Sequence, residues 1–161
     1  MNKADDFIQL VKHPVKFRMF LLMKLPSAFF CGVRVKSISA ENAAVTVPYK
    51  WLSQNPFKST YFACLAMAAE MSTGLLAMAN TYKSKPAISM LVTGLQATYH
   101  KKAVGITTFT CEDGNAIAET VKESIATGEG RTIKARSVGK NENGEIVAEF
   151  FIEWSFKAKT S

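Results

Sequence analysis

A single carboxylate interrupts the most apolar stretch of this sequence. Glu70 is the only charged residue between Ser59 and Tyr82, in a stretch rich in Ala, Met, Leu and Phe. The positions three and four residues away, where a helical ion pair would form, hold Ala66, Met67, Thr73 and Gly74. Burial raises the pKa of a lone carboxyl group and suits it to act as a base or nucleophile near neutral pH. The alternative is a half-buried Glu that pairs with a distant Lys or faces solvent.

Other groups with catalytic potential lack partners. His13 and His100, the two histidines, have no Ser, Cys or Asp partner nearby in the sequence and are interpreted as surface or capping residues. Neither GxSxG nor a glycine-rich phosphate-binding loop occurs. The three cysteines, an odd number without a CxxC motif, are interpreted as buried thiols of a reducing, cytoplasmic compartment. No cluster of ligands predicts a metal site.

The composition is that of one globular domain. The chain has 161 residues, of which 48% are hydrophobic and 20% charged, and its net charge is +7. An anionic partner is therefore plausible: a nucleic acid, a lipid surface or a phosphorylated small ligand. The Lys and Arg residues are scattered, which argues against nucleic acid. The start of the sequence, MNKADDF, does not have the pattern of a signal peptide.

Residues 58–82 are expected to form a long helix that is apolar on all sides and therefore buried. Its length also fits a membrane span, but the central carboxylate would cost several kcal/mol, about 2.5–3.5 on insertion scales, so no stable span is predicted. Before it, residues 5–25 have a helical pattern that Pro14 should kink or split and Pro26 should end.

Alternating apolar and polar residues predict strands on both sides of the long helix. GVRVKS and ENAAVTVPYK form a hairpin, and residues 87–100 and 103–112 form two further strands. A short helix over residues 115–127 precedes a last hairpin, RTIKARSV and EIVAEFFIEWSFK, which turns at Asn143–Gly144. One face of the last strand is expected to be apolar: Ile146, Ala148, Phe150, Ile152, Trp154 and Phe156.

This order of elements resembles the hotdog-fold thioesterase superfamily, in which an antiparallel sheet wraps a long apolar helix. In related acyl-CoA thioesterases an Asn precedes that helix, a His-Gly-Gly opens it and an acid follows within it. At that spacing this sequence has Asn55, then Tyr61-Phe62-Ala63, then Glu70. The stretch from Thr93 to Gly105 and the closing GEIVAEFFIEWSFK are also similar to strands of the family. The absence of His-Gly-Gly indicates a divergent branch.

The resemblance implies an α+β hotdog domain over residues 1–161, with an N-terminal helical extension at 5–25 and a core at 30–157. It also implies hydrolysis of an acyl-CoA or similar acyl thioester. Glu70 would act as base or nucleophile, and Asn55 would position the water or the carbonyl. The backbone N–H of Phe62 would stabilise the oxyanion, although bulky Tyr61 and Phe62 would narrow the approach.

Further substrate contacts follow from the same resemblance. Apolar side chains would line the acyl pocket, namely Tyr61, Met67, Met71, Leu75 and Met90, although core packing is the simpler reading for each methionine and leucine. Lys101, Lys102 and Arg131 would meet the phosphates of coenzyme A, which is part of the substrate; no separate cofactor is implied. The family implies a homodimer, with dimers of dimers common, and active sites that combine both chains.

Two other functions fit the same fold. A non-catalytic module that binds acyl-CoA or a lipid is favoured by the altered start of the long helix. A hotdog dehydratase would need a His and an acid near the helix, but the nearest histidine is thirty residues from Glu70.

Overall fold

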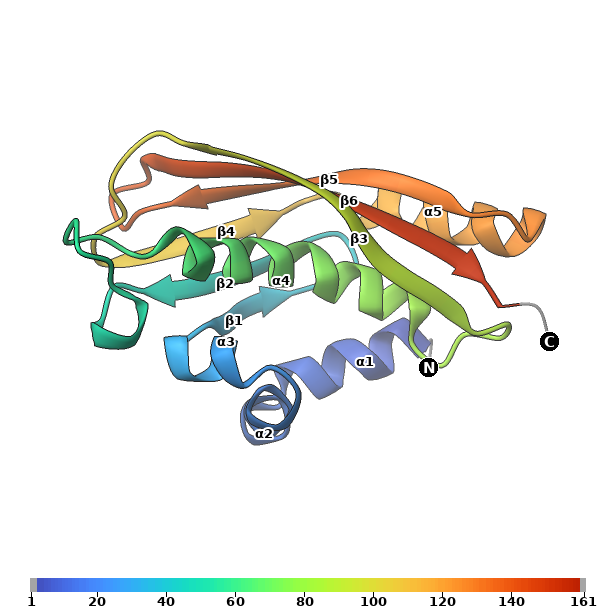
Figure 1. Ribbon diagram of the computed structural model, residues 1–161. Helices are drawn as coiled ribbons and strands as arrows, with labels where there is room; N and C mark the ends of the chain where they lie inside the picture. The colour runs from blue at the N-terminus through green and yellow to red at the C-terminus, as the bar shows by residue number, and fades with distance from the viewer. Residues whose placement is uncertain (1–2, 160–161) are drawn as a thin grey trace.

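Six strands form one antiparallel sheet in the computed structural model, which describes residues 3–159 (Figure 1). Their order across the sheet is β1-β2-β4-β5-β6-β3. The strands are β1 (Arg34–Ile38), β2 (Ala43–Pro48), β3 (Ile88–Tyr99), β4 (Ile106–Cys111), β5 (Arg131–Lys140) and β6 (Ile146–Ala158). Both predicted hairpins are present, because β1 pairs with β2 and β5 pairs with β6. The predicted α+β architecture is confirmed.

The long helix α4 (Phe62–Thr81) runs along the inner face of the sheet (Figure 1). It packs against β2, β4 and β5 and against the neighbouring helices, which explains why its sequence is apolar on all sides. By length and composition α4 passes for a membrane span, but 67% of its most apolar window is buried inside the protein. It is therefore the core helix of the domain.

The helix α4 begins four residues later than the sequence predicts. The short 3-10 helix η1 (Trp51–Ser53) and the loop up to Tyr61 precede it. The side chain of Asn55 holds this loop: its Oδ1 accepts hydrogen bonds from the backbone N–H of Phe57 (3.0 Å) and of Ser59 (3.2 Å). These hydrogen bonds hold residues 55–59 in a turn, so these residues do not extend α4 toward the N-terminus.

Three short helices precede the sheet. Pro14 splits the predicted helix, as expected, into α1 (Lys3–Lys12) and α2 (Pro14–Lys24), and His13 caps α2 by accepting a hydrogen bond from the N–H of Lys16 (3.4 Å). As expected, this helical segment ends before Pro26, since α2 stops at Lys24. The sequence did not predict the helix that follows. Pro26 begins a third helix, α3 (Pro26–Cys31), because proline is well tolerated at the first position of a helix.

The helix α5 (Gly114–Thr127) lies against α4, β5 and β6, close to the predicted position. On β6 the apolar face predicted from alternation is buried from Ala148 to Phe156. Ile146 is the exception, with 42% of its surface exposed. It pairs with Lys140 next to the β5–β6 turn, at a shift in the register, and lies at the rim of the core.

The strand β3 forms one edge of the sheet and pairs only with β6. After a shift in the register between Val92 and Gly94, Leu95 and Tyr99 lie opposite Ile152 and Ala148, whose side chains are buried. Leu95 and Tyr99 therefore point to the inner face, yet 53% and 45% of their surfaces are exposed. The end of β3 thus presents apolar side chains that the chain itself does not cover.

Candidate functional site

Glu70 borders an apolar cavity of about 320 Å³ between α2, α4 and the strands β3 and β6. Its carboxylate and the Lys24 ammonium are the charged groups among the lining residues. The apolar walls consist of Phe17, Phe20, Leu25, Met71, Gly74, Leu75, Met78, Met90 and Trp154. This volume, which we call the Glu70 cavity, is large enough for a small ligand.

The Glu70 carboxylate makes no hydrogen bond or ion pair with any residue in the described range 3–159. Burial removes water from it and raises its pKa. The local pair that the sequence lacks is thus not replaced by a distant one. The Glu70 carboxylate can therefore accept a proton without first breaking another interaction, and it lies beside the apolar Glu70 cavity.

Neighbouring side chains fix the position of this carboxylate. Gly74 lies one helical turn after Glu70, and a Cβ at Gly74 would lie 3.1 Å from Glu70 Oε1 and 3.2 Å from the Trp154 ring. The indole N–H of Trp154 donates a hydrogen bond to Thr73 Oγ1 (2.8 Å), which orients this wall of the cavity. The missing side chain at residue 74 therefore leaves room beside the carboxylate and the indole ring.

A second, smaller cavity of about 220 Å³ lies on the other side of Glu70, beside the start of α3. Met67 lines it, and Met71 and Lys24 line both cavities. The structure therefore brings together Glu70, Met67 and Met71 as the sequence analysis supposed. It also places Leu75 and Met90 in the wall of the Glu70 cavity.

Except for Arg131, the remaining predicted site residues lie around a different cavity, of about 500 Å³, which we call the loop cavity. It is lined by residues of the loop before α4 and of the segment after β3, among them Asn55, Tyr61, Phe62, Lys101 and Lys102. At the start of α4 no side chain caps the helix, so the N–H of Phe62 has no acceptor within the helix. His100 also lines the loop cavity.

Several of these polar groups already have partners. Asn55 Oδ1 accepts three hydrogen bonds from the loop, and its Nδ2 donates to the carbonyl of Thr60 (3.5 Å). Lys101 forms an ion pair with Glu145, and Lys102 Nζ donates to the carbonyl of Phe57 (3.3 Å). Arg131 pairs with Phe156 in the sheet, at the far end of β6 from Lys101, about 26 Å away along the strand.

Within one chain, the loop cavity and the Glu70 cavity are separate sites. Phe62 and Glu70 are eight residues apart on α4, which corresponds to about 12 Å along the helix axis. One chain therefore does not bring Asn55 and the Phe62 N–H to the same reacting atom as Glu70.

The sequence analysis missed the side chains of α2 that line the Glu70 cavity, namely Phe17, Phe20 and Lys24, and Leu25 directly after α2. It also treated Trp154 only as a core residue. No local pattern links these residues to Glu70, because the contacts join segments far apart in the sequence. One signal was available: Gly74 follows Glu70 by four residues, the spacing of one helical turn.

The cysteines are free thiols, as the sequence predicted. Burial raises the pKa of Cys64 to about 12, and a hydrogen bond to Cys31, whose Sγ lies 3.5 Å away, adds to this effect. Cys64 is therefore a poor nucleophile. Cys31 is only half-buried, in contrast to the expectation of a buried thiol. Among the described residues no cluster of His, Cys, Asp and Glu has the arrangement of a metal site.

Comparisons with known proteins identify the fold. A family model described as "Domain of unknown function (DUF4442)" matches residues 15–156. No curated protein matches the sequence. Among solved structures, a Pseudomonas aeruginosa protein described as "Probable Thioesterase" is similar with a TM-score of 0.75 and 18% identity, over 91% of this chain and 97% of that one.

Two further structures show the same architecture. A Chlorobaculum tepidum protein of unknown function has a TM-score of 0.75 and 18% identity, over 89% of this chain and 93% of its own. A thioesterase of Haemophilus influenzae has a TM-score of 0.63 and 11% identity, over 89% of both chains. The thioesterases in this group have the hotdog fold, so the fold expected from the sequence is confirmed.

Proposed function

The chain belongs to the DUF4442 family and has the hotdog fold of thioesterases, and from this premise we propose that it hydrolyses an acyl-CoA or a similar acyl thioester. One observation carries the proposal. Glu70 is a half-buried carboxylate with a raised pKa, no partner within residues 3–159 and an apolar cavity beside it. A structural Glu in this position would be expected to have a partner, because an unpaired buried carboxylate is costly.

In this proposal the acyl group lies in the Glu70 cavity and its thioester carbon lies next to the carboxylate. Glu70 removes a proton from water as the water oxygen attacks the carbonyl carbon. The C–S bond then breaks, and the protonated Glu70 returns its proton to the leaving sulfur, which releases the acid and the thiol. Direct attack by the carboxylate, followed by hydrolysis of the resulting anhydride, uses the same geometry. In both routes negative charge develops on the carbonyl oxygen and requires a hydrogen-bond donor.

The donor nearest the start of α4 is the N–H of Phe62, which the macrodipole of the helix strengthens. Since it lies about 12 Å along the axis from Glu70 of the same chain, we propose that a second copy supplies it. The uncovered apolar side chains at the end of β3, Leu95 and Tyr99, and the exposed Phe62 are suited to pack against that copy. The edge of β3 offers unpaired backbone groups for the same contact.

The two copies would share each site. Asn55 would keep the loop in the conformation that presents the Phe62 N–H, through the hydrogen bonds it already makes. Lys102, which uses one of its three donors on the carbonyl of Phe57, would meet a phosphate of coenzyme A. Lys101 would contact a phosphate only if its ion pair with Glu145 breaks or if its ammonium group contacts both anions.

A second function, the non-catalytic binding of an acyl thioester or lipid, is favoured by Tyr61 and Phe62. Their rings lie 4.9 Å apart between centroids, with 44% and 56% of their surfaces exposed, at the place where the related enzymes have a His and a Gly. These rings narrow the approach to the Phe62 N–H. A site that binds an acyl thioester but does not stabilise an oxyanion would not need free access to this N–H.

A panel of acyl-CoA thioesters with aliphatic and aromatic acyl groups distinguishes the two functions. Binding is measured by calorimetry, and release of the free thiol is measured with a chromogenic thiol reagent. Hydrolysis predicts thiol release well above a preparation from cells without the protein, for at least one acyl group. Binding of several thioesters without thiol release would reject hydrolysis and favour the binding module.

A further inference from the structure

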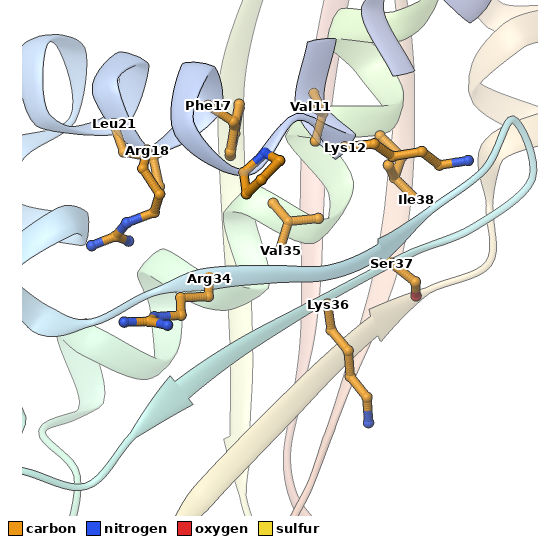
Figure 2. Close-up of a pocket in the computed structure, with 11 residues that line it drawn as sticks. Val11, Lys12, Phe17, Arg18, Leu21, Arg34, Val35, Lys36, Ser37 and Ile38 are labelled. Atoms are coloured by element: carbon orange, nitrogen blue, oxygen red, sulfur yellow. The ribbon is translucent and has the colours of Figure 1, made fainter. Parts of the chain in front are cut away.

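A groove of about 510 Å³ lies between α2 and the edge strand β1 (Figure 2). Its lining contains four cations and no Asp or Glu: Lys12, Arg18, Arg34 and Lys36. None of these cations forms an ion pair with a described residue, since the four ion pairs within residues 3–159 lie elsewhere. We call this feature the basic groove.

Two of the cations lie close together at one end of the basic groove. Figure 2 shows the guanidinium groups of Arg18, from α2, and Arg34, from β1, extending toward the same side. Arg18 is held in place, because its Nη1 donates to the carbonyl of Val33 (3.0 Å) and its Cζ lies 4.0 Å from the centre of the Phe29 ring. Burial and the charge of Arg34 lower the pKa of Arg18. Two like charges that act on each other electrostatically favour an anion near both.

The floor of the groove is apolar. Val35 of β1 is half-buried beside Phe17 of α2, and the lining also includes Val11, Leu21 and Ile38. Val11, Phe17, Leu21 and Ile38 are buried, so Val35 is the apolar side chain of the floor that is partly exposed. A free inorganic anion would use the arginines and leave the exposed part of Val35 uncovered. A purely apolar ligand would leave the two guanidinium groups without a counter-ion. The lining therefore matches a ligand that has both parts.

We propose that the basic groove binds an anionic amphiphile: a carboxylate or phosphate head group at Arg18 and Arg34, and an apolar chain over Phe17 and Val35. A planar guanidinium suits either head group, because it donates two parallel hydrogen bonds. The site differs from the Glu70 cavity, since α2 separates the two and only Phe17 lines both. The inference goes beyond thioester hydrolysis and does not depend on it.

The test uses the full chain and soluble probes below their micelle concentrations. Dodecyl phosphate and dodecanoate carry the two head groups, dodecanol lacks a charge, and inorganic phosphate lacks a chain. Calorimetry should show that at least one of the two anionic amphiphiles binds more tightly than both dodecanol and inorganic phosphate. Preference for one head group identifies it as the natural one. No binding of either, or equal binding of dodecanol, would overturn the proposal.

Variants locate the binding. Arg34→Gln should weaken binding of the preferred amphiphile about tenfold or more, since a charge-assisted pair is lost. Arg34 is exposed and has no ion pair with a described residue, so the fold should be retained, which the melting temperature checks. Lys157→Gln, an equal change of charge on the exposed side of β6, should leave the affinity unchanged.

Amide shifts in NMR spectra give an independent readout. The probe should perturb residues 14–21 and 33–38 in the wild-type protein, and Glu70→Gln should not alter the affinity. Shifts confined to residues around the Glu70 cavity, or an Arg34→Gln protein that binds as tightly as wild type, would overturn the proposal.

Discussion

At the scale of the residue, Glu70 carries a free-energy cost: its carboxylate is partly removed from water, and the described fold provides no partner in return. The carboxylate loses water on folding and gains no hydrogen bond or ion pair from the described chain. Gly74 leaves room beside it, and the indole of Trp154, oriented by Thr73, lies next to that room. Residues that lower stability in this way are characteristic of functional sites.

This cost predicts how stability depends on pH. The pKa of Glu70 is raised in the folded state, so its folding penalty is absent below the unfolded pKa, about 4.3, and is complete above the folded pKa. Glu70→Gln should therefore gain stability relative to wild type as the pH rises from 4.5 to 8. Urea unfolding across this range measures the difference. Glu129→Gln, at an exposed position, is the control. The account is contradicted if the stability difference between Glu70→Gln and wild type does not change with pH, or changes no more than it does for Glu129→Gln.

The sequence alone predicted the isolation of Glu70 but not its surroundings. No cation lies at helical spacing from Glu70, and that local fact suffices to identify an unpaired acid. The walls from Phe17 and Lys24 depend on how α2 packs across α4, which is a long-range contact without a local signal. Asn55 was predicted to act on the substrate, a role that stays a prediction, whereas its loop hydrogen bonds are what the structure shows.

At the scale of the element, periodicity was a reliable guide. The alternation in β5 and β6 and the continuous apolar composition of α4 predicted elements close to their observed bounds. Two features were missed: the short helix α3, which begins at Pro26, and the late start of α4 after the loop held by Asn55. Caps and turns decide these boundaries, through side-chain contacts that hydrophobic patterns do not report.

The start of α5 illustrates such a contact. A Cβ at Gly114 would lie 2.2 Å from the carbonyl oxygen of Ala40 and 2.6 Å from that of Glu41, both backbone atoms of the β1–β2 turn. Gly114→Ala should therefore lower the free energy of unfolding by about 2 kcal/mol or more, because the backbone cannot move aside. Gly130→Ala, where a Cβ meets nothing within 4 Å, is the matched control and should change it by less than about 0.5 kcal/mol. Urea unfolding of both variants measures the difference. Equal free energies of unfolding for the two variants would show that the close contact of Gly114 with the β1–β2 turn does not matter for stability.

At the scale of the whole molecule, the separation of the loop cavity from the Glu70 cavity is the main geometric finding. If both act on one thioester, the loop of one chain must reach Glu70 of another. The exposed apolar end of β3 gives a second copy a place to pack. Neither feature follows from the order of elements, since both depend on which side chains the folded chain leaves uncovered.

Complementation between two inactive variants tests this arrangement. Asn55→Ala and Glu70→Gln should each lose most thioesterase activity, and co-folding them should restore about a quarter of the wild-type rate. Half of randomly formed dimers pair unlike chains, and each of these has one intact site of two. The oligomeric state is checked by light scattering. No recovery in a mixture shown to exchange subunits would mean that each site is built from a single chain.

The central claim is that Glu70 performs hydrolysis, and the most direct test is the rate of thiol release by Glu70→Gln. The account predicts a fall in kcat of at least about 100-fold, the usual contribution of a general base, while acyl-CoA binding and the fold are retained. Glu129→Gln should keep the wild-type rate. A Glu70→Gln protein that releases thiol as fast as wild type would contradict the account.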